Sequence, residues 1–328
     1  MQKPIKRIAV FTSGGDAPGM NAAIRAVVRT ASYYDLHVYG VMRGYEGMID
    51  GDFRLLERQD VANIIHRGGT ILKTARSERF MTPEGRKLAF ESLTAFDIDA
   101  CVAIGGNGTF TGAKVFSEEY NIPIIGIPGT IDNDLYGTDY TIGFDTAVNT
   151  AMQAVDRIRD TADSHNRLFF IEVMGRHAGY IALHTAIGSG AESVVIPEVG
   201  GMDIDRLTDL LRKNARRKKL FSLVIVAEGN KIGSTADISK MVNERVQGFD
   251  IRYAIIGHLQ RGGSPNSMDR VLASRLGYAS VEGLMHGQRN VMAGIINDQV
   301  AFTSFEEAIY KEKPIDKDLI RMAEILAM

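Results

Sequence analysis

The feature that most constrains this chain is a repeated unit, in which a short apolar run ends in a glycine-bearing loop, most often followed by an amphipathic segment. The first unit runs from Ile8–Thr12 through Ser13-Gly14-Gly15-Asp16 to a helix-like stretch over Met20–Ala31. Further runs that end in such loops are Cys101–Ile104 before Gly105–Thr109, Ile124–Ile127 before Pro128–Asp134, Leu168–Val173 before Met174–Gly179, Leu223–Val226 before Glu228-Gly229, and Ala254–Ile256 before Gly257–Gly263.

This repetition predicts an α/β fold. Short continuous apolar runs suit strands buried on both faces of a parallel sheet, and their alternation with helical patterns favours helices on both sides. The layout of residues 168–187 repeats that of residues 8–28, which indicates two similar Rossmann-like lobes with mainly parallel sheets flanked by helices. Ligands of such folds bind beyond the carboxyl ends of the strands, where all these loops lie.

Bulk properties exclude several classes of function. A chain of 328 residues is long enough for two domains. The net charge of −2 gives no electrostatic case for nucleic-acid or membrane partners, and no apolar stretch approaches the length of a membrane span. The single cysteine, Cys101, lies in an apolar run, so we expect a buried, inert thiol, no intramolecular disulfide and a reducing cytoplasm.

The glycine loops allow two interpretations. Glycine after a strand lets backbone N–H groups approach a phosphate, or it simply makes the turn. Two such loops in one chain favour a nucleotide. The common nucleotide motifs are nevertheless incomplete, because Met20-Asn21 stands where a P-loop has Lys-Ser/Thr, and Thr111 stands at the third glycine of a dinucleotide fingerprint.

Charged residues in these loops point to phosphoryl transfer. Asp132 and Asp134 follow a strand, and they are read either as a proton acceptor with its neighbour or as turn residues. Arginines occur in loops (Arg76, Arg176 and Arg261, with His258 beside the last) or just before strands (Arg167 and Arg252). Guanidinium groups bind phosphate in a bidentate manner, so several at strand ends indicate a substrate with more than one phosphate.

Taken together, the motifs resemble those of bacterial ATP-dependent 6-phosphofructokinases over nearly the whole chain. The stretches that carry the resemblance are Thr12–Asn21, Pro128–Asp134, Met174-Gly175-Arg176 and Gly257–Pro265. The resemblance implies transfer of the γ-phosphoryl group of ATP to the 1-hydroxyl of fructose 6-phosphate in glycolysis, with Mg²⁺. It also implies an ATP-binding lobe over residues 1–140 plus about 256–305, and a sugar-phosphate lobe over about 141–255 plus 306–328.

The same resemblance implies roles for individual residues. Asp132 is expected to be the catalytic base, with Thr130 and Arg176 steadying the transferring group. The residues expected to hold ATP are Gly15, Arg76, Ser77, Gly106, Asn107, Gly108 and Thr109. The substrate-binding set is expected to be Thr130, Asp132, Arg167, Met174, Gly175, Arg176, Glu228, Arg252, His258 and Arg261.

Regulation and assembly are further implications of the resemblance. An effector site for ADP or phosphoenolpyruvate is expected to use Arg25, Arg29, Arg58, Arg159, Gly190, Glu192, Arg217 and Lys219. Arg167 and Arg252 match positions that reach into a neighbouring subunit, which implies a homotetramer.

Two positions bear on the phosphoryl donor and the metal. Pyrophosphate-using relatives carry aspartate and lysine where this chain has Gly108 and Gly129, so we expect ATP as the donor. Asn107 stands where the family usually has a metal-binding aspartate, and it keeps an oxygen ligand but no charge. This position keeps open an alternative, a weakly active or regulatory paralogue that binds nucleotide and sugar phosphate.

Overall fold

The chain folds into two compact units, which we describe separately. The computed structural model describes residues 4–164, 167–199, 204–216, 222–246 and 250–327. Unit 1 comprises residues 1–131, 135–145 and 261–313, and unit 2 comprises residues 132–134, 146–260 and 314–328. Helix α5, Phe144–Ser164, begins at the end of a unit 1 segment and runs into unit 2.

Unit 1 is built on a seven-stranded sheet with the order β11-β10-β5-β4-β1-β2-β3. Its strands are β1 (Arg7–Thr12), β2 (His37–Val41), β3 (Phe53–Leu56), β4 (Ala100–Gly105), β5 (Ile124–Pro128), β10 (Val291–Ile296) and β11 (Gln299–Ser304). The helices are α1 (Met20–Tyr33), α2 (Gly44–Asp50), α3 (Pro83–Ala95), α4 (Asn107–Tyr120), α9 (Ser267–Met285) and α10 (Phe305–Tyr310), with a 3₁₀ turn, η1, over Arg79–Met81. The central pairings are parallel and only β3 and β11 run antiparallel, so the prediction of a mainly parallel sheet is confirmed.

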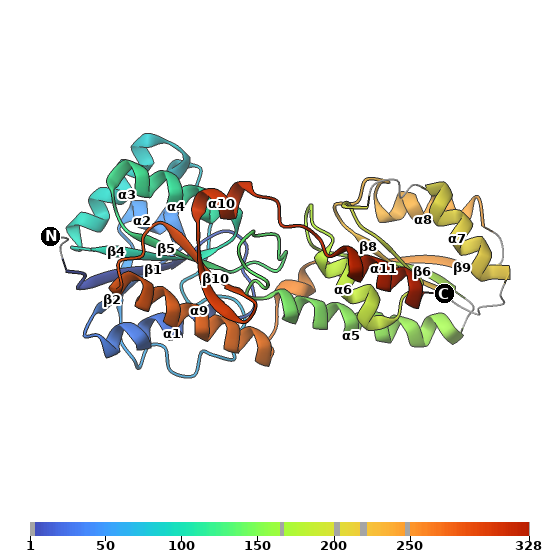
Figure 1. The fold of residues 1–328 in the computed structure, drawn as a ribbon, viewed down its shortest axis with the longest axis horizontal. Helices are drawn as coiled ribbons and strands as arrows, with labels where there is room; N and C mark the ends of the chain where they lie inside the picture. The colour runs from blue at the N-terminus through green and yellow to red at the C-terminus, as the bar shows by residue number, and fades with distance from the viewer. Residues whose placement is uncertain (1–3, 165–166, 200–203, 217–221, 247–249, 328) are drawn as a thin grey trace. The chain divides into compact units, whose positions relative to one another are not determined.

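The core of unit 1 follows from the alternation of side chains along its central strands. Ala9, Phe11 and Cys101 point to one face, where they join Phe110 and Phe116 of α4 in one hydrophobic cluster. Helices α1 and α9 pack against each other beside the sheet (Figure 1). Because both faces are covered, the central strands read as continuous apolar runs. Cys101 is fully buried, as predicted.

Unit 2 has a smaller, wholly parallel sheet with the order β7-β8-β6-β9. Its strands are β6 (Arg167–Val173), β7 (Ser193–Val195), β8 (Ser222–Ala227) and β9 (Asp250–Ile255). The helices are α6 (Tyr180–Ser189), α7 (Ile204–Arg216), α8 (Thr235–Asn243) and α11 (Lys317–Leu326), and a second 3₁₀ turn, η2, covers Gly257–Arg261. The core between this sheet and helices α7 and α8 includes Phe170, Leu211, Val226 and Ile238.

Both arginines that were expected just before strands lie inside them, and Arg167 is the first residue of β6. The apolar run Ala254–Ile256 placed Arg252 before a strand, but β9 already begins at Asp250, and Arg252 lies inside it, opposite Phe169 of β6. An edge strand needs no apolar side chains where its face is exposed, and β9 is mostly exposed, so its hydrophobic pattern understates its length. None of the helices in the described ranges is both long and apolar enough to span a membrane.

Candidate functional site

Three glycine-bearing loops meet in unit 1, at the carboxyl ends of the adjacent strands β1, β4 and β5. The N–H group of Ser13 donates to the carbonyl of Ile104 over 3.0 Å, and the Thr109 hydroxyl donates to the carbonyl of Ser13 over 3.0 Å. The N–H group of Gly129 donates to the carbonyl of Gly105, also over 3.0 Å. Loops that follow different strands are thereby held as one surface.

The start of α4 makes this surface suited to an anion. Gly106 is the extended N-cap, and Asn107 is the first residue of the helix. Gly105 has no room for a side chain, because a Cβ there would lie 2.2 Å from Oγ1 of Thr109 and 2.6 Å from the carbonyl oxygen of Ser13. Backbone N–H groups and the helix dipole at such an N-terminus favour phosphate. The expected ATP residues over 106–109 are thus brought next to the loop that contains Gly15.

Thr130 lies beside this helix start. A Cβ added to Gly106 would be 3.4 Å from Cβ of Thr130, and the hydroxyl of Thr141 donates to the Thr130 carbonyl over 2.6 Å. Thr130 is 9% exposed, and Asp132, two residues later, is 4% exposed. Asp132 belongs to the short segment that groups with unit 2.

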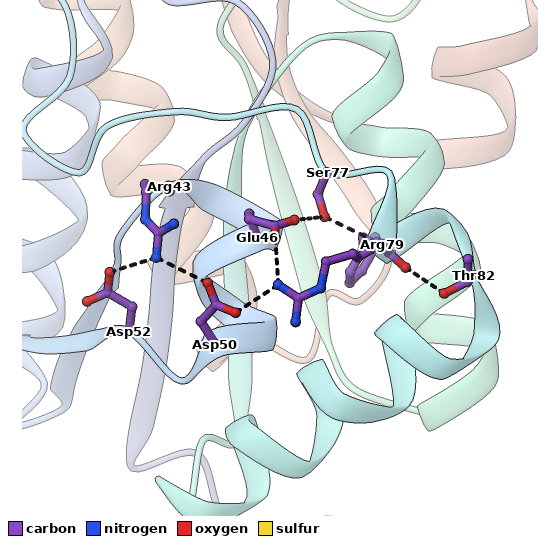
Figure 2. A network of polar contacts seen from close by, with 8 residues as sticks. Arg43, Glu46, Asp50, Asp52, Ser77, Arg79 and Thr82 are labelled. Carbon is purple, nitrogen blue, oxygen red and sulfur yellow. Dashed lines mark hydrogen bonds and ion pairs between the residues drawn. The ribbon is translucent and has the colours of Figure 1, made fainter.

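The segment that carries Arg76 and Ser77 is fastened to unit 1 on both sides. The hydroxyl of Thr74 donates to the carbonyl of Gly14 over 2.7 Å. The hydroxyl of Ser77 donates to Oε2 of Glu46 over 2.5 Å and accepts the N–H group of Phe80 over 3.1 Å (Figure 2). Arg76 lies between these two anchors with an exposed side chain.

Two residues expected to grip the sugar phosphate fall in different units. Arg261 belongs to unit 1, where its Nη1 donates to the carbonyl of Asp16 over 3.1 Å. Its guanidinium also lies against Gly15, 2.6 Å from where a Cβ would be. His258 is an exposed residue of unit 2. The structure therefore places Arg261 against the first glycine loop.

In unit 2, the loop that contains Met174, Gly175 and Arg176 is held by two side chains. The N–H group of Met174 donates to Oε1 of Gln260 over 2.9 Å, and the N–H group of Arg176 donates to Oε1 of Glu228 over 2.6 Å. Arg176 has a left-handed backbone conformation with φ 52°, and its own side chain is exposed. Glu228 thus supports the loop through its carboxylate, and the fully buried Gln260 is a support that the sequence analysis missed.

Arg167 and Arg252 meet at a shared carboxylate, on the neighbouring strands β6 and β9. Nε of Arg167 lies 3.0 Å from Oδ2 of Asp250, and Nη2 of Arg252 lies 3.1 Å from Oδ1 of the same residue. The hydrogen bond from Arg167, with the positive charges of both guanidinium groups, lowers the pKa of the Asp250 carboxyl. Asp250 was also missed, although its place two residues before Arg252 puts both on one face of the strand.

The expected effector residues divide between the units. In unit 1, Arg25 and Arg29 lie one turn apart on α1, and Nε of Arg58 donates to Oγ of Ser32 on the same helix over 2.6 Å. Burial, with the charge of Arg29 as the second cause, lowers the pKa of Arg25.

In unit 2, Arg159 donates to the carbonyl of Ser189, next to Gly190, and the carboxylate of Glu192 accepts the N–H group of Leu223. Gly190 and Glu192 line a cavity of about 760 Å³ between α6, α7 and α11. Arg217 and Lys219 lie outside the described residues.

The described part of the chain contains no group of three or more His, Cys, Asp or Glu side chains arranged to hold a metal ion. Mg²⁺ commonly takes one or two protein oxygens and completes its shell with water and substrate phosphates. The amide oxygen of Asn107, at the helix start of unit 1, fits that limited protein share.

Known proteins of one family are similar to this chain. A family model described as Phosphofructokinase matches residues 7–284. The chain is 56% identical over 322 residues to an ATP-dependent 6-phosphofructokinase of Cytophaga hutchinsonii, which covers 98% of both chains. It is 55% identical to ATP-dependent 6-phosphofructokinase 1 of Thermus thermophilus, over 99% of this chain and 100% of that one.

Among solved structures, a phosphofructokinase of Saccharomyces cerevisiae matches with a TM-score of 0.89 and 34% identity. The match covers 98% of this chain and 48% of the yeast chain, so this chain spans about half the length of that relative.

Proposed function

The chain belongs to the phosphofructokinase family, and we propose that it transfers the γ-phosphoryl group of ATP to the 1-hydroxyl of fructose 6-phosphate in the cytoplasm. The observation that carries this proposal is the junction of the three loops of unit 1, where hydrogen bonds join Thr109 to Ser13 and Gly129 to Gly105. That surface supplies backbone N–H groups for phosphates, and the relatives that match along their full length are named for ATP-dependent transfer to this sugar phosphate.

In this proposal unit 1 binds the nucleotide and unit 2 binds the sugar phosphate. Gly15, Arg76, Ser77 and residues 106–109 hold ATP, while Met174, Gly175, Arg176, Glu228 and His258 surround the sugar phosphate. Arg261 also binds the sugar phosphate, and its contact with Asp16 sets its position beside the nucleotide loop. What supports the sugar loop is the pair of contacts from Gln260 and Glu228, which fix its backbone.

Asp132 accepts the proton of the attacking hydroxyl in the proposed mechanism. Its near-complete burial shields the carboxylate from bulk water, which suits a group that must exchange a proton with substrate alone. Thr130 and Arg176 steady the transferring phosphoryl group, because this reaction depends mainly on positioning and on neutralising charge. Asn107 would hold Mg²⁺ through its amide oxygen, and Mg²⁺ at the phosphates would neutralise their charge.

The choice of ATP over pyrophosphate is supported at the two glycines noted in the sequence. Apart from its chain neighbours and the backbone of its own helix, no heavy atom of the described chain lies within 4 Å of a Cβ built on Gly108, so the space over the helix start is open to a nucleotide. A Cβ on Gly129 would lie 3.0 Å from Cγ2 of Ile104, so a lysine at position 129 would crowd the end of the neighbouring strand β4.

Regulation and assembly complete the proposal. Arg25, Arg29 and Arg58 in unit 1, with Arg159, Gly190 and Glu192 in unit 2, would bind ADP or phosphoenolpyruvate as effectors. Arg167 and Arg252 would reach the sugar phosphate of a neighbouring subunit in a homotetramer. Within one subunit, both guanidinium groups are held by ion pairs with Asp250.

A coupled assay tests the reaction. Fructose 6-phosphate is supplied with either ATP or pyrophosphate at saturating Mg²⁺, and formation of fructose 1,6-bisphosphate is measured. We expect turnover with ATP and little with pyrophosphate. Binding of ATP with only trace turnover would favour the regulatory paralogue, while turnover with pyrophosphate alone would refute the donor assignment.

A further inference from the structure

Helix α2 presents two carboxylates to residues 74–80 of unit 1, the segment that carries Arg76 and Ser77. The proposed reaction does not use either carboxylate. Glu46 and Asp50 are four residues apart and therefore lie on one face of the helix. Oε1 of Glu46 lies 2.6 Å from Nη1 of Arg79, and Oδ1 of Asp50 lies 2.8 Å from the same nitrogen. Figure 2 shows these contacts, together with the bond from Ser77 to Glu46.

Glu46 is the member of this network that contacts two residues of the segment at once. One carboxylate oxygen accepts the hydroxyl of Ser77 and the other pairs with Arg79, so a single side chain holds two positions of the segment. The hydroxyl of Ser77 in turn accepts the N–H group of Phe80, a residue within the 3₁₀ turn η1. The hydroxyl group of Ser77 therefore links α2 to this turn.

The far end of the same segment is fastened to the first glycine loop through Thr74 and Gly14. Arg76 lies between the two fastened residues, and its exposed side chain is the cation that the proposed function assigns to ATP. Loss of the Ser77 anchor would free one side of this segment. ATP binding would then have to order the segment as well as contact it.

We propose that Glu46 is a positioning residue of the nucleotide subsite, which holds Ser77 and Arg79 so that Arg76 is presented to ATP in an ordered segment. This inference rests on the proposed function, since it assumes that the segment contacts ATP. The hydrogen bond from Ser77, followed by the contact with Arg79, lowers the pKa of Glu46, so the carboxylate is ionised at neutral pH.

A purely structural role predicts a different result. Arg79 is half exposed, and ion pairs of that kind contribute little to the stability of the whole protein. If Glu46 served only the fold, its removal would change neither nucleotide affinity nor any kinetic constant. If it positions the segment, the effect appears in ATP affinity alone.

The test compares Glu46→Ala and Arg79→Ala with the parent, because Ser77 is itself assigned to ATP and its removal would not separate positioning from contact. Equilibrium binding of a non-hydrolysable ATP analogue is measured, together with kcat and the KM values for ATP and fructose 6-phosphate. We expect both variants to weaken analogue binding and raise the KM for ATP about tenfold, equivalent to about 1.4 kcal/mol. The kcat and the KM for fructose 6-phosphate should stay within about twofold of the parent.

Three further variants make the result specific. Glu46→Gln keeps an oxygen acceptor for Ser77 and should stay within about threefold of the parent. The double variant Glu46→Ala/Arg79→Ala should resemble Glu46→Ala, because Glu46→Ala already removes the contact between these two side chains. The matched control is Asp52→Asn, which lies in the same network but contacts Arg43, and which should behave as the parent (Figure 2).

The outcomes separate this inference from the function on which it rests. Analogue binding by Glu46→Ala and Arg79→Ala within twofold of the parent overturns the positioning role and leaves the proposed function standing. Failure of the parent itself to bind the analogue overturns the proposed function, and the inference with it. A thermal unfolding midpoint is recorded for each variant, and if Glu46→Ala does not fold, Arg79→Ala decides the matter.

Discussion

Replacement of Thr109 by valine should weaken ATP binding by separating the two glycine loops of unit 1. Thr109 is 3% exposed, and its hydroxyl donates over 3.0 Å to the carbonyl of Ser13, a residue that is 7% exposed. Valine keeps the shape of the side chain and removes the donor. A buried carbonyl that loses its donor costs about 1–3 kcal/mol. If this cost falls on the arrangement that binds ATP, affinity drops about 5- to 150-fold.

The assay is the KM for ATP, together with equilibrium binding of a non-hydrolysable analogue, and the matched control is Thr109→Ser. Serine keeps the hydroxyl and loses a buried methyl group, which lowers the free energy of unfolding by about 1 kcal/mol. Both variants should therefore unfold at a lower temperature than the parent, but only Thr109→Val should bind ATP weakly. Equal KM values for ATP in the two variants would refute the idea that this hydrogen bond shapes the nucleotide site.

The remaining predictions concern the metal, the base, the sugar phosphate and the thiol. Asn107→Asp should raise activity and lower the Mg²⁺ concentration required, by about one or two powers of ten, and an unchanged Mg²⁺ titration would remove Asn107 as a degraded metal ligand. Asp132→Asn should lower kcat about 10²–10⁴-fold with an unchanged unfolding midpoint, whereas turnover within a few-fold of the parent would assign Asp132 to the turn. Arg167→Ala and Arg252→Ala should raise the half-saturating concentration of fructose 6-phosphate far more than that of ATP. Hybrids of these variants with Asp132→Asn subunits should recover some activity, and inactive hybrids despite confirmed subunit exchange would refute the shared site. Burial raises the pKa of the Cys101 thiol to about 12, so at pH 8 about one molecule in 10⁴ carries the thiolate, and iodoacetamide should label Cys101 only in denaturant; labelling of the native protein at the rate of a free thiol would contradict this.

The strand and loop pattern could be predicted because it is written in local sequence. A buried parallel strand must be apolar on both faces, and the turn after it must allow a close backbone approach, as at Gly105. These requirements act within a few residues, so β1, β4 and β5 could be located together with their loops. Arg252 was placed outside its strand because an exposed edge strand lacks this double constraint.

The supports of the candidate site could not be predicted in the same way. Gln260 and Asp250 are ordinary polar residues until the fold brings Gln260 to the N–H group of Met174 and Asp250 to two arginines. Glu46 reads as a surface residue of a helix, and nothing near it in the sequence indicates Ser77 as its partner.

The sequence by itself determined the fold class, the loops that carry the chemistry and the family, since these depend on residue types at short spacing. The tertiary structure decided which of those loops touch. Thr109 reaches Ser13 across 96 positions, and Arg261 reaches Asp16 across 245. Such contacts depend on the order β5-β4-β1-β2 in the sheet and on hydrogen-bond distances near 3 Å, and strand order is a property of the packed chain that no short stretch of sequence contains.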